Sequence, residues 1–178
     1  MTTRVLLDAC VLVPATTRGL LIGAARAGYF IPLWSPQILA EWAHAAAKQG
    51  PQVAAQTATE QALLAAEFPA SMVSPSGHND LSLPDPDDIH VLAAAIAGDA
   101  SELLTANTQD FPLRALAAYG LLRRHPDEFL LELAHAHPDT LIRLAQTTHA
   151  SLPNAGGLRK TFQKSGLNRF AKWLASQG

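Results

Sequence analysis

Short and long apolar segments alternate along the first two thirds of the chain. The short ones, among them RVLLDACVLV at residues 4–13 and ELLTAN at residues 102–107, are rich in leucine and β-branched residues without strict alternation. That pattern is typical of parallel strands covered on both faces. The longer ones, such as SPQILAEWAHAAA from Ser35, repeat apolar residues at helical spacing. Strands that alternate with helices predict an α/β fold around a parallel sheet.

Capping and turn residues set the expected limits of the elements. Ser35 followed by Pro36 is a typical helix start, and that helix should end near Gly50. Further helices are expected from Thr16 or Thr17 to Gly28, at residues 51–68, at 85–97 and at 112–120. Further strands are expected at residues 29–34, 71–74 and 121–125, the last of them at an edge of the sheet.

From residue 126 onward the pattern is helical only. The last segment, LRKTFQKSGLNRFAKWLAS, contains no acidic residue, and its apolar residues Leu167, Phe170, Ala171 and Leu174 recur at helical spacing. One interpretation is that its basic side approaches an RNA backbone while the apolar side docks on the rest of the protein or on a second subunit. The other is a packed helix with an ordinary charged surface. The basic residues are Arg159, Lys160, Lys164, Arg169 and Lys172.

Composition favours a folded protein in a reducing compartment. Of the 178 residues, 48% are hydrophobic and 16% are charged, which is richer in core-forming residues than a disordered chain. Cys10 is the single cysteine and cannot form an internal disulfide, and no apolar run approaches the roughly 20 residues that span a membrane. We therefore expect a soluble, cytoplasmic protein that does not enter membranes.

The net charge of −2 hides an uneven distribution. Residues 1–110 hold eleven acidic against four basic residues, whereas residues 111–178 hold four acidic against nine basic ones. An acidic first part suits cation binding, and a basic last part suits contact with phosphates or an acidic partner. Helix surfaces that are simply charged unevenly would give the same pattern.

Two carboxylates of the acidic part stand among apolar neighbours. Asp8 lies near the end of the first strand, where functional groups gather in parallel sheets, and a buried carboxylate is costly unless it is paired or metal-bound. Glu41 falls beside Ile38 and Trp42 on the apolar side of its helix. The alternatives are that Asp8 caps a turn and that Glu41 faces solvent.

Three aspartates crowd in front of the helix expected at residues 85–97. Asp85 fits the N-cap position, and the charges of Asp87 and Asp88 complement the helix dipole. Capping is a sufficient explanation for Asp85 and Asp87. Asp88, however, precedes apolar residues at spacings of three, four and seven, which turns its side chain toward the buried face.

Polar residues also follow the second buried strand, in LLTANTQDF. Thr105, Asn107 and Asp110 are ordinary turn formers when each is considered alone. Several inward or strand-end acids in one half of the chain are harder to explain separately, because like charges at close range need a cation to coexist. Hard oxygen ligands suit Mg²⁺ or Mn²⁺ rather than zinc.

Four motifs in the same order and spacing, DACVLVPA, WSPQILAE, DPDDIHVLAAAIA and LLTANTQDF, resemble those of the PIN-domain nucleases. The resemblance is closest to the bacterial branch that contains VapC-type toxins, and it covers about residues 4–132. It implies a three-layer α/β/α sandwich around the parallel sheet, with carboxylates that converge on Mg²⁺ or Mn²⁺. We therefore divide the chain into a PIN-like nuclease domain, residues 1–132, and a helical, basic C-terminal extension, residues 133–178.

The resemblance also assigns roles to single residues. Glu41 would bind metal through water or act as the base that orients the attacking water, and Thr105 and Asn107 would support the site. Two positions depart from the family pattern: Cys10 stands where Asn or Ser is usual, and Asn107 stands where some relatives have a further aspartate. The four acids that correspond to the catalytic, metal-binding set are Asp8, Glu41, Asp88 and Asp110.

What the resemblance implies about function is a metal-dependent endoribonuclease that leaves 5′-phosphate and 3′-hydroxyl ends, as the toxin of a type II toxin–antitoxin pair. Its expected partners are RNA, a cognate antitoxin and, at the level of the family, a second copy of itself. A catalytically idle PIN-like module that binds RNA or protein is the main alternative. A phosphatase of the haloacid dehalogenase type would need an aspartate two residues after Asp8, where this chain has Cys10.

Overall fold

Four parallel strands form the centre of the molecule, in the order β2-β1-β3-β4. The computed structural model describes residues 2–77, 80–153 and 155–177. Leu6 of the central β1 strand pairs with Leu33 on one side and Leu103 on the other, and all three side chains are fully buried. The predicted parallel sheet is confirmed, with β4 at one edge as its sequence predicted. The strands are β1 (Arg4–Leu7), β2 (Ile31–Leu33), β3 (Glu102–Leu104) and β4 (Leu122–Arg124).

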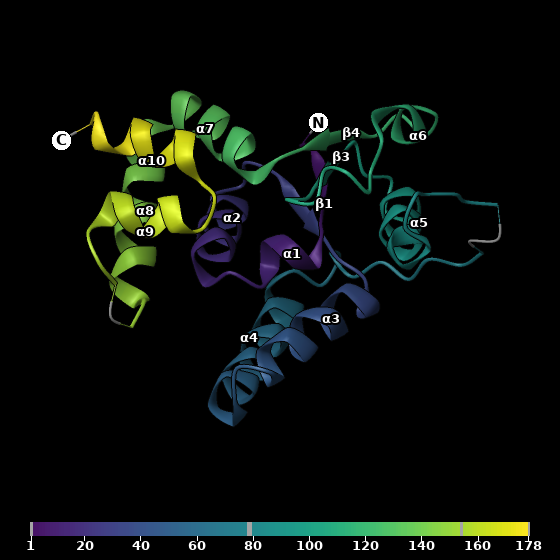
Figure 1. Cartoon of the computed structure of the whole chain (residues 1–178), viewed down its shortest axis with the longest axis horizontal. Helices are drawn as coiled ribbons and strands as arrows, with labels where there is room; N and C mark the ends of the chain where they lie inside the picture. Colours follow the sequence, from purple (N-terminus) through teal and green to yellow (C-terminus); the bar gives the residue numbers. More distant parts are fainter. Residues whose placement is uncertain (1, 78–79, 154, 178) are drawn as a thin grey trace.

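Helices cover both faces of this sheet and complete three layers (Figure 1). Helix α5 lies on one side of the strands, and α2, with the C-terminal helices beyond it, lies on the other. This is the expected α/β/α sandwich. No helix among the described residues is both long and apolar enough to cross a membrane. The helices up to β4 are α1 (Ala9–Leu12), α2 (Ala15–Arg26), α3 (Pro36–Ala47), α4 (Pro51–Glu67), α5 (Ile89–Ala97) and α6 (Leu113–Ala117).

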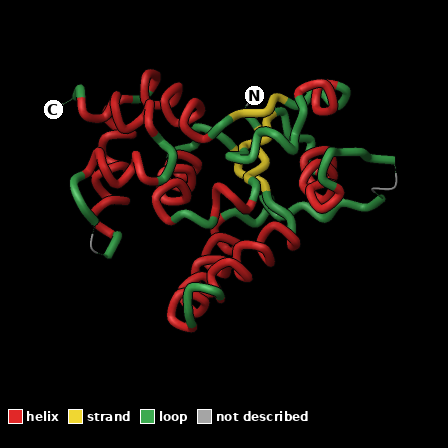
Figure 2. The backbone as a smooth tube through the Cα atoms, viewed as in Figure 1, coloured by secondary structure: helices red, strands yellow, loops and turns green. Residues whose placement is uncertain are grey.

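The α3–α4 pair projects away from the sheet (Figures 1 and 2). Helix α3 begins as predicted, because the Ser35 hydroxyl accepts a hydrogen bond from the Ile38 amide at 3.2 Å. Gly50, between the two helices, has a backbone φ of 122°, a value that residues other than glycine rarely adopt. An Arg18–Glu60 ion pair of 2.8 Å ties α4 back to α2. Since α3 follows β2, the pair borders the carboxyl ends of the strands.

In the described part of the chain four helices follow β4; the first three contact α2, and the last packs on the first and the third (Figure 1). Helix α8 approaches α2 closely because Gly19 and Gly23 carry no side chain; an added Cβ would come within 2.7 Å of Thr148 and 2.5 Å of Leu144. The expected domain boundary after residue 132 falls inside α7, and the division stays a prediction. The helices are α7 (Pro126–Ala136), α8 (Pro138–Ser151), α9 (Leu158–Lys164) and α10 (Asn168–Ala175).

A buried carboxylate joins the last helix to α7. Asp127, 6% exposed, accepts hydrogen bonds from the backbone amides of Arg169 and Phe170, both at 2.9 Å. These amides belong to the first turn of α10, whose N–H groups have no partner inside the helix. The predicted apolar stripe of this helix is also buried. The C-terminal helices are therefore docked on the rest of the chain by both polar and apolar contacts.

Three local features differ from the sequence prediction. Residues 71–74 form no strand; Met72 makes only an isolated bridge to Trp34. The one-turn helix α1 directly after β1 was not expected. The helix predicted at residues 85–97 begins as a 3₁₀ turn, η1 (Pro86–Asp88), before α5. Pro86 has no N–H to donate, and the Asp85 carboxylate accepts from the Asp87 amide at 2.9 Å, which favours this tighter start.

Candidate metal centre

Asp8 stands directly after β1, at the N-cap position of α1. Its backbone N–H continues the sheet by donating to the Leu104 carbonyl at 3.1 Å. Its side chain makes no capping bond to α1, so the turn-capping alternative does not explain it. Instead the carboxylate, in a residue that is 7% exposed, accepts a hydrogen bond from the Thr105 hydroxyl at 2.7 Å. The first strand thus delivers a buried carboxylate to the end of β3.

Thr105 and Cys10 hold that carboxylate in place. The Cys10 thiol donates to the same Asp8 oxygen, Oδ2, at 3.0 Å and lies 3.4 Å from the Thr105 hydroxyl. The backbone N–H of Ala106 donates to the Cys10 sulfur at 3.3 Å, and that of Asn107 donates to the Thr105 oxygen at 3.0 Å. Thr105 therefore supports Asp8, in agreement with the role expected for it, and Cys10 joins the same network.

Three aspartates from two segments meet beyond this network. One oxygen from each of Asp85, Asp88 and Asp110 lies within 4.8 Å of the others, and all three residues are half-buried. Asp85 is the N-cap of the η1 turn and Asp88 is its last residue, while Asp110 follows β3. The Asn107 amide donates a hydrogen bond to Asp110. The structure thus brings together two of the four expected acids and adds Asp85.

The sequence interpretation gave Asp85 a capping role only. It does accept the Asp87 amide, so that role is confirmed, but its carboxylate also belongs to the cluster. A signal was available in the spacing, since side chains three residues apart are neighbours on a helix, as Asp85 and Asp88 are in the sequence. Asp87 is exposed and lies outside the cluster, as the sequence predicted.

The remaining expected acids act on this cluster electrostatically. Burial raises the pKa of the Asp88 carboxyl to about 6, and the charges of Asp8, Asp110, Asp85 and Glu41 add to that rise. Four neighbouring carboxylates therefore make ionisation of Asp88 less favourable. Such mutual repulsion is relieved when a cation binds.

Glu41 reaches the site from α3, on the β2 side of the sheet. Its side chain is 42% exposed and contacts His90, with Oε1 2.7 Å from Nε2. Burial raises the pKa of the Glu41 carboxyl and the Asp8 charge adds to the rise, whereas His90 opposes it. Glu41 thus contacts a buried histidine while part of its side chain is exposed, and its role at the site stays a prediction.

The donor set suits a hard divalent cation. Asp85, Asp88 and Asp110 offer only carboxylate oxygens, which Mg²⁺ and Mn²⁺ prefer, whereas a zinc site would be expected to include histidine or thiolate ligands. Burial raises the pKa of the Cys10 thiol to about 12, with the Asp8 charge adding, so this sulfur stays protonated. The residues present thus fit Mg²⁺ or Mn²⁺.

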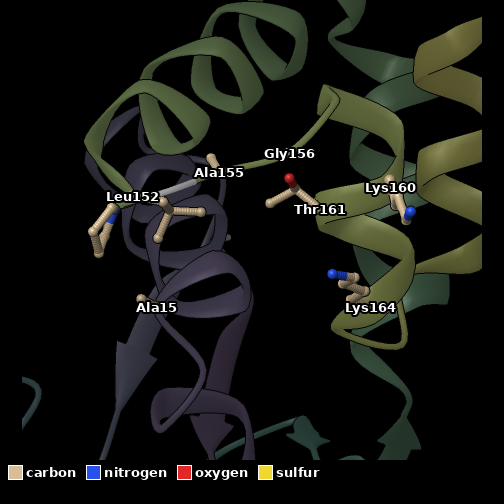
Figure 3. A pocket seen from close by; sticks show the side chains of 8 residues that line it. Ala15, Leu152, Ala155, Gly156, Lys160, Thr161 and Lys164 are labelled. Carbon is tan, nitrogen blue, oxygen red and sulfur yellow. The ribbon is translucent and has the colours of Figure 1, made fainter.

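The basic residues of the C-terminal extension lie elsewhere, on α9 and α10. Lys160 and Lys164 line a cavity of about 370 Å³ together with Thr161 and the first residue of α2, Ala15 (Figure 3). The Lys164 side chain extends into the space between α9 and α2 in this view. Arg169 differs from the two lysines, because it pairs with Glu128 at 3.2 Å.

Comparison with known proteins places this geometry in context. A family model described as PIN domain matches residues 3–109, which include Asp8, Glu41 and Asp88. A curated relative named "Putative ribonuclease VapC50", from Mycobacterium tuberculosis, is 47% identical over 45 residues, or 25% of this chain. The match spans only 27% of that relative's length. No solved structure matches the chain.

Proposed function

Because this chain belongs to the PIN-domain family, as its motifs predicted, we propose that it is a divalent-metal-dependent endoribonuclease, a hydrolase of RNA phosphodiester bonds. One observation carries the proposal: the carboxylates of Asp85, Asp88 and Asp110 approach within 4.8 Å of one another. Carboxylates at such short distances repel one another, and a bound divalent cation offsets this repulsion. Burial raises the pKa of the Asp88 carboxyl, and that repulsion adds to the rise.

Each acid has a distinct place in this proposal. Asp88 and Asp110 would hold Mg²⁺ or Mn²⁺, with Asp85 as an added ligand and Asp8 oriented toward them by Thr105. When bound, the ion supplies positive charge that orients the scissile phosphate and offsets the charge that develops during cleavage. Asn107 orients the Asp110 carboxylate through its amide.

Glu41 would act on the attacking water. The Glu41 charge acts on Asp88 in the acidic cluster, and its half-exposed carboxylate is held by His90 while its exposed part meets water. The raised pKa of this carboxyl brings it closer to the range in which a carboxylate accepts a proton at physiological pH. Glu41 is therefore assigned as the residue that orients the water and that binds the metal ion through this water.

The biological setting is proposed from the partial relative. That relative is named as a VapC ribonuclease, and the motifs of this chain resemble the same branch. We assign this chain as the toxin of a type II toxin–antitoxin pair, acting on RNA in the cytoplasm and held by a cognate antitoxin, with a homodimer as a further expectation. Since the match spans 27% of the relative, the partners rest on this likeness alone.

A catalytically idle module that binds RNA or protein is the second candidate, and two contacts favour it. Cys10 donates to Asp8 and Asn107 donates to Asp110. Each contact gives a carboxylate a neutral hydrogen-bond donor, which stabilises the charged form without a cation. An acidic site kept for folding alone would use such donors.

Cleavage of a mixed RNA pool by the purified protein, with Mg²⁺, Mn²⁺ or EDTA, tests the proposed function. Asp88→Asn removes a charge from the cluster, and Asp87→Asn makes the same chemical change on its exposed neighbour outside the cluster. We expect metal-dependent cleavage by the wild type and by Asp87→Asn, and none by Asp88→Asn. Intact RNA with folded wild-type protein and both metals would favour the idle module.

A further inference from the structure

A buried histidine joins the two helices that carry acids of the site. His90, the second residue of α5, is 8% exposed, and its Nε2 lies 2.7 Å from Oε1 of Glu41 on α3. It follows Asp88 by two residues along the chain. The contact therefore links the segment that bears the acidic cluster to the helix on the far side of β1.

The ring makes this one polar contact. Among the described residues, the other ring nitrogen of His90, Nδ1, has no hydrogen-bond partner and is buried. A neutral imidazole has one N–H and one lone pair. If the proton is on Nε2, this N–H donates a hydrogen bond to the Glu41 carboxylate. The buried Nδ1 then carries a lone pair rather than an N–H without an acceptor.

We propose that His90 is a positioning residue: it donates a hydrogen bond from Nε2 to Oε1 of Glu41 and holds that carboxylate in place at the metal centre. The inference rests on the proposed function for its catalytic consequence. The contact between His90 and Glu41 is itself observed and does not depend on the proposed function.

Packing alone does not account for a histidine at this position. The residues that follow it on α5, Val91 and Leu92, are apolar and fully buried, and an apolar side chain would fill the same layer. Burying a polar ring is unfavourable unless it is hydrogen-bonded, so the contact with Glu41 accounts for a histidine at position 90. The Glu41 side chain in turn needs a contact that fixes its conformation, because a half-exposed glutamate has several rotamers and the Asp8 charge repels its carboxylate.

The test compares three variants. His90→Leu removes the donor but keeps an apolar body, and His90→Gln keeps an amide N–H that reaches toward Glu41. His44→Leu is the matched control, because His44 is an exposed histidine on α3 itself. Each protein is titrated with Mn²⁺, and its kcat and KM for RNA cleavage are measured.

Positioning residues of metal sites typically contribute 10–100-fold to metal affinity or activity. We expect His90→Leu to bind Mn²⁺ about 10-fold more weakly and to lose kcat with little change in KM, and His90→Gln to recover most of both. His44→Leu should match the wild type. In a Glu41→Ala background, His90→Leu should cause no further loss. Equal Mn²⁺ affinity in His90→Leu and wild type, or a full additional loss without Glu41, would overturn the inference.

A measurement on the wild type guards against a variant that does not fold. Nitrogen-15 NMR of the His90 ring should find a proton on Nε2 that exchanges slowly with solvent. A ring protonated at Nδ1 alone could not donate to Glu41 and would overturn the inference. The NMR and Mn²⁺ results need no cleavage, so an absence of RNA cleavage in the wild type would count against the proposed function and leave this contact judged separately.

Discussion

Thr105 donates its hydroxyl hydrogen to the Asp8 carboxylate across 2.7 Å, and this bond joins the ends of β3 and β1. Both residues are buried, at 0% and 7% exposure. The backbone N–H of Asn107 donates to the same hydroxyl, so the Thr105 oxygen accepts one hydrogen bond while its hydrogen is donated to Asp8. The bond therefore determines how the first acid of the site is oriented.

Thr105→Val keeps the shape of this side chain and removes its hydroxyl. A hydrogen bond to a charged group contributes about 1.5–3 kcal/mol, and the Asn107 amide would also lose its acceptor, so we expect a loss of stability of at least that size. Urea denaturation measures it. Thr105→Ser should recover most of the loss, and Thr147→Val, at an exposed site on α8, should change stability little. A neutral effect of Thr105→Val would mean that the bond is replaced by water.

Asp88→Asn should stabilise the metal-free protein at pH 7.5. Its carboxyl pKa is raised to about 6 by burial and by neighbouring carboxylates, so the folded state holds this proton more tightly than the unfolded state. The contribution of this carboxyl to the free energy of unfolding is fully present at a pH below its ordinary pKa of about 3.8. That contribution is lost as the pH rises through about 6. Thermal unfolding in EDTA at pH 7.5 and at pH 5.0 should therefore show a smaller advantage for Asp88→Asn at the lower pH.

Divalent metal should reverse that ranking. Mg²⁺ or Mn²⁺ at pH 7.5 should raise the unfolding temperature of the wild type more than that of Asp88→Asn, because binding offsets the repulsion that the substitution has already removed. Asp87→Asn provides the control and should behave as the wild type in both buffers. A variant that gains no stability in EDTA would show that the cluster is not under electrostatic repulsion.

Cys10 should react slowly with alkylating reagents. Only the thiolate is nucleophilic, and burial together with the Asp8 charge raises the pKa of this thiol to about 12. Iodoacetamide at pH 8 should modify the folded protein at least about tenfold more slowly than the same protein in urea. Cys10→Ser keeps a donor to Asp8 and should retain RNA cleavage. Rapid alkylation of the folded protein would contradict both the burial and the protonated state.

Asp127→Ala should loosen the C-terminal helices. It removes the acceptor for two amides at the start of α10, and loss of such a cap typically costs about 0.5–2 kcal/mol. We expect lower stability in urea and earlier cleavage of α10 by a protease. Asp139→Ala, in the exposed first turn of α8, is the control. Equal protease resistance in both variants would show that the apolar contacts dock the helix without this carboxylate.

A double substitution of Lys160 and Lys164 by alanine tests the proposed RNA contact of the C-terminal extension. Both side chains are exposed and border one cavity. Loss of two phosphate contacts to single-stranded RNA should weaken binding and reduce the salt slope of the logarithm of the association constant by about 1.4. The control is Lys48→Ala, at the exposed C-cap of α3. Deleting residues 155–178 would be a poorer test, because it removes buried residues of α10 as well as charges.

Local signals in the sequence were sufficient for the scaffold. The β1 strand, the start of α3 at Ser35 and the edge position of β4 follow from neighbouring residues, since strand composition, N-caps and prolines act over a few positions. Asp8, Asp88 and Asp110 could be singled out because each stands next to an apolar run. The family resemblance then predicted the order in which the layers are assembled.

The tertiary structure decided which of these side chains meet. The second role of Asp85 depends on the position of Asp110, which a different segment brings beside it. The contact of His90 with Glu41 depends on two helices placed on either side of β1. No sequence periodicity encodes such distances, because they arise when separate apolar faces pack against one sheet. The sequence by itself therefore determined the elements and the acids, whereas only the folded chain determined their partners.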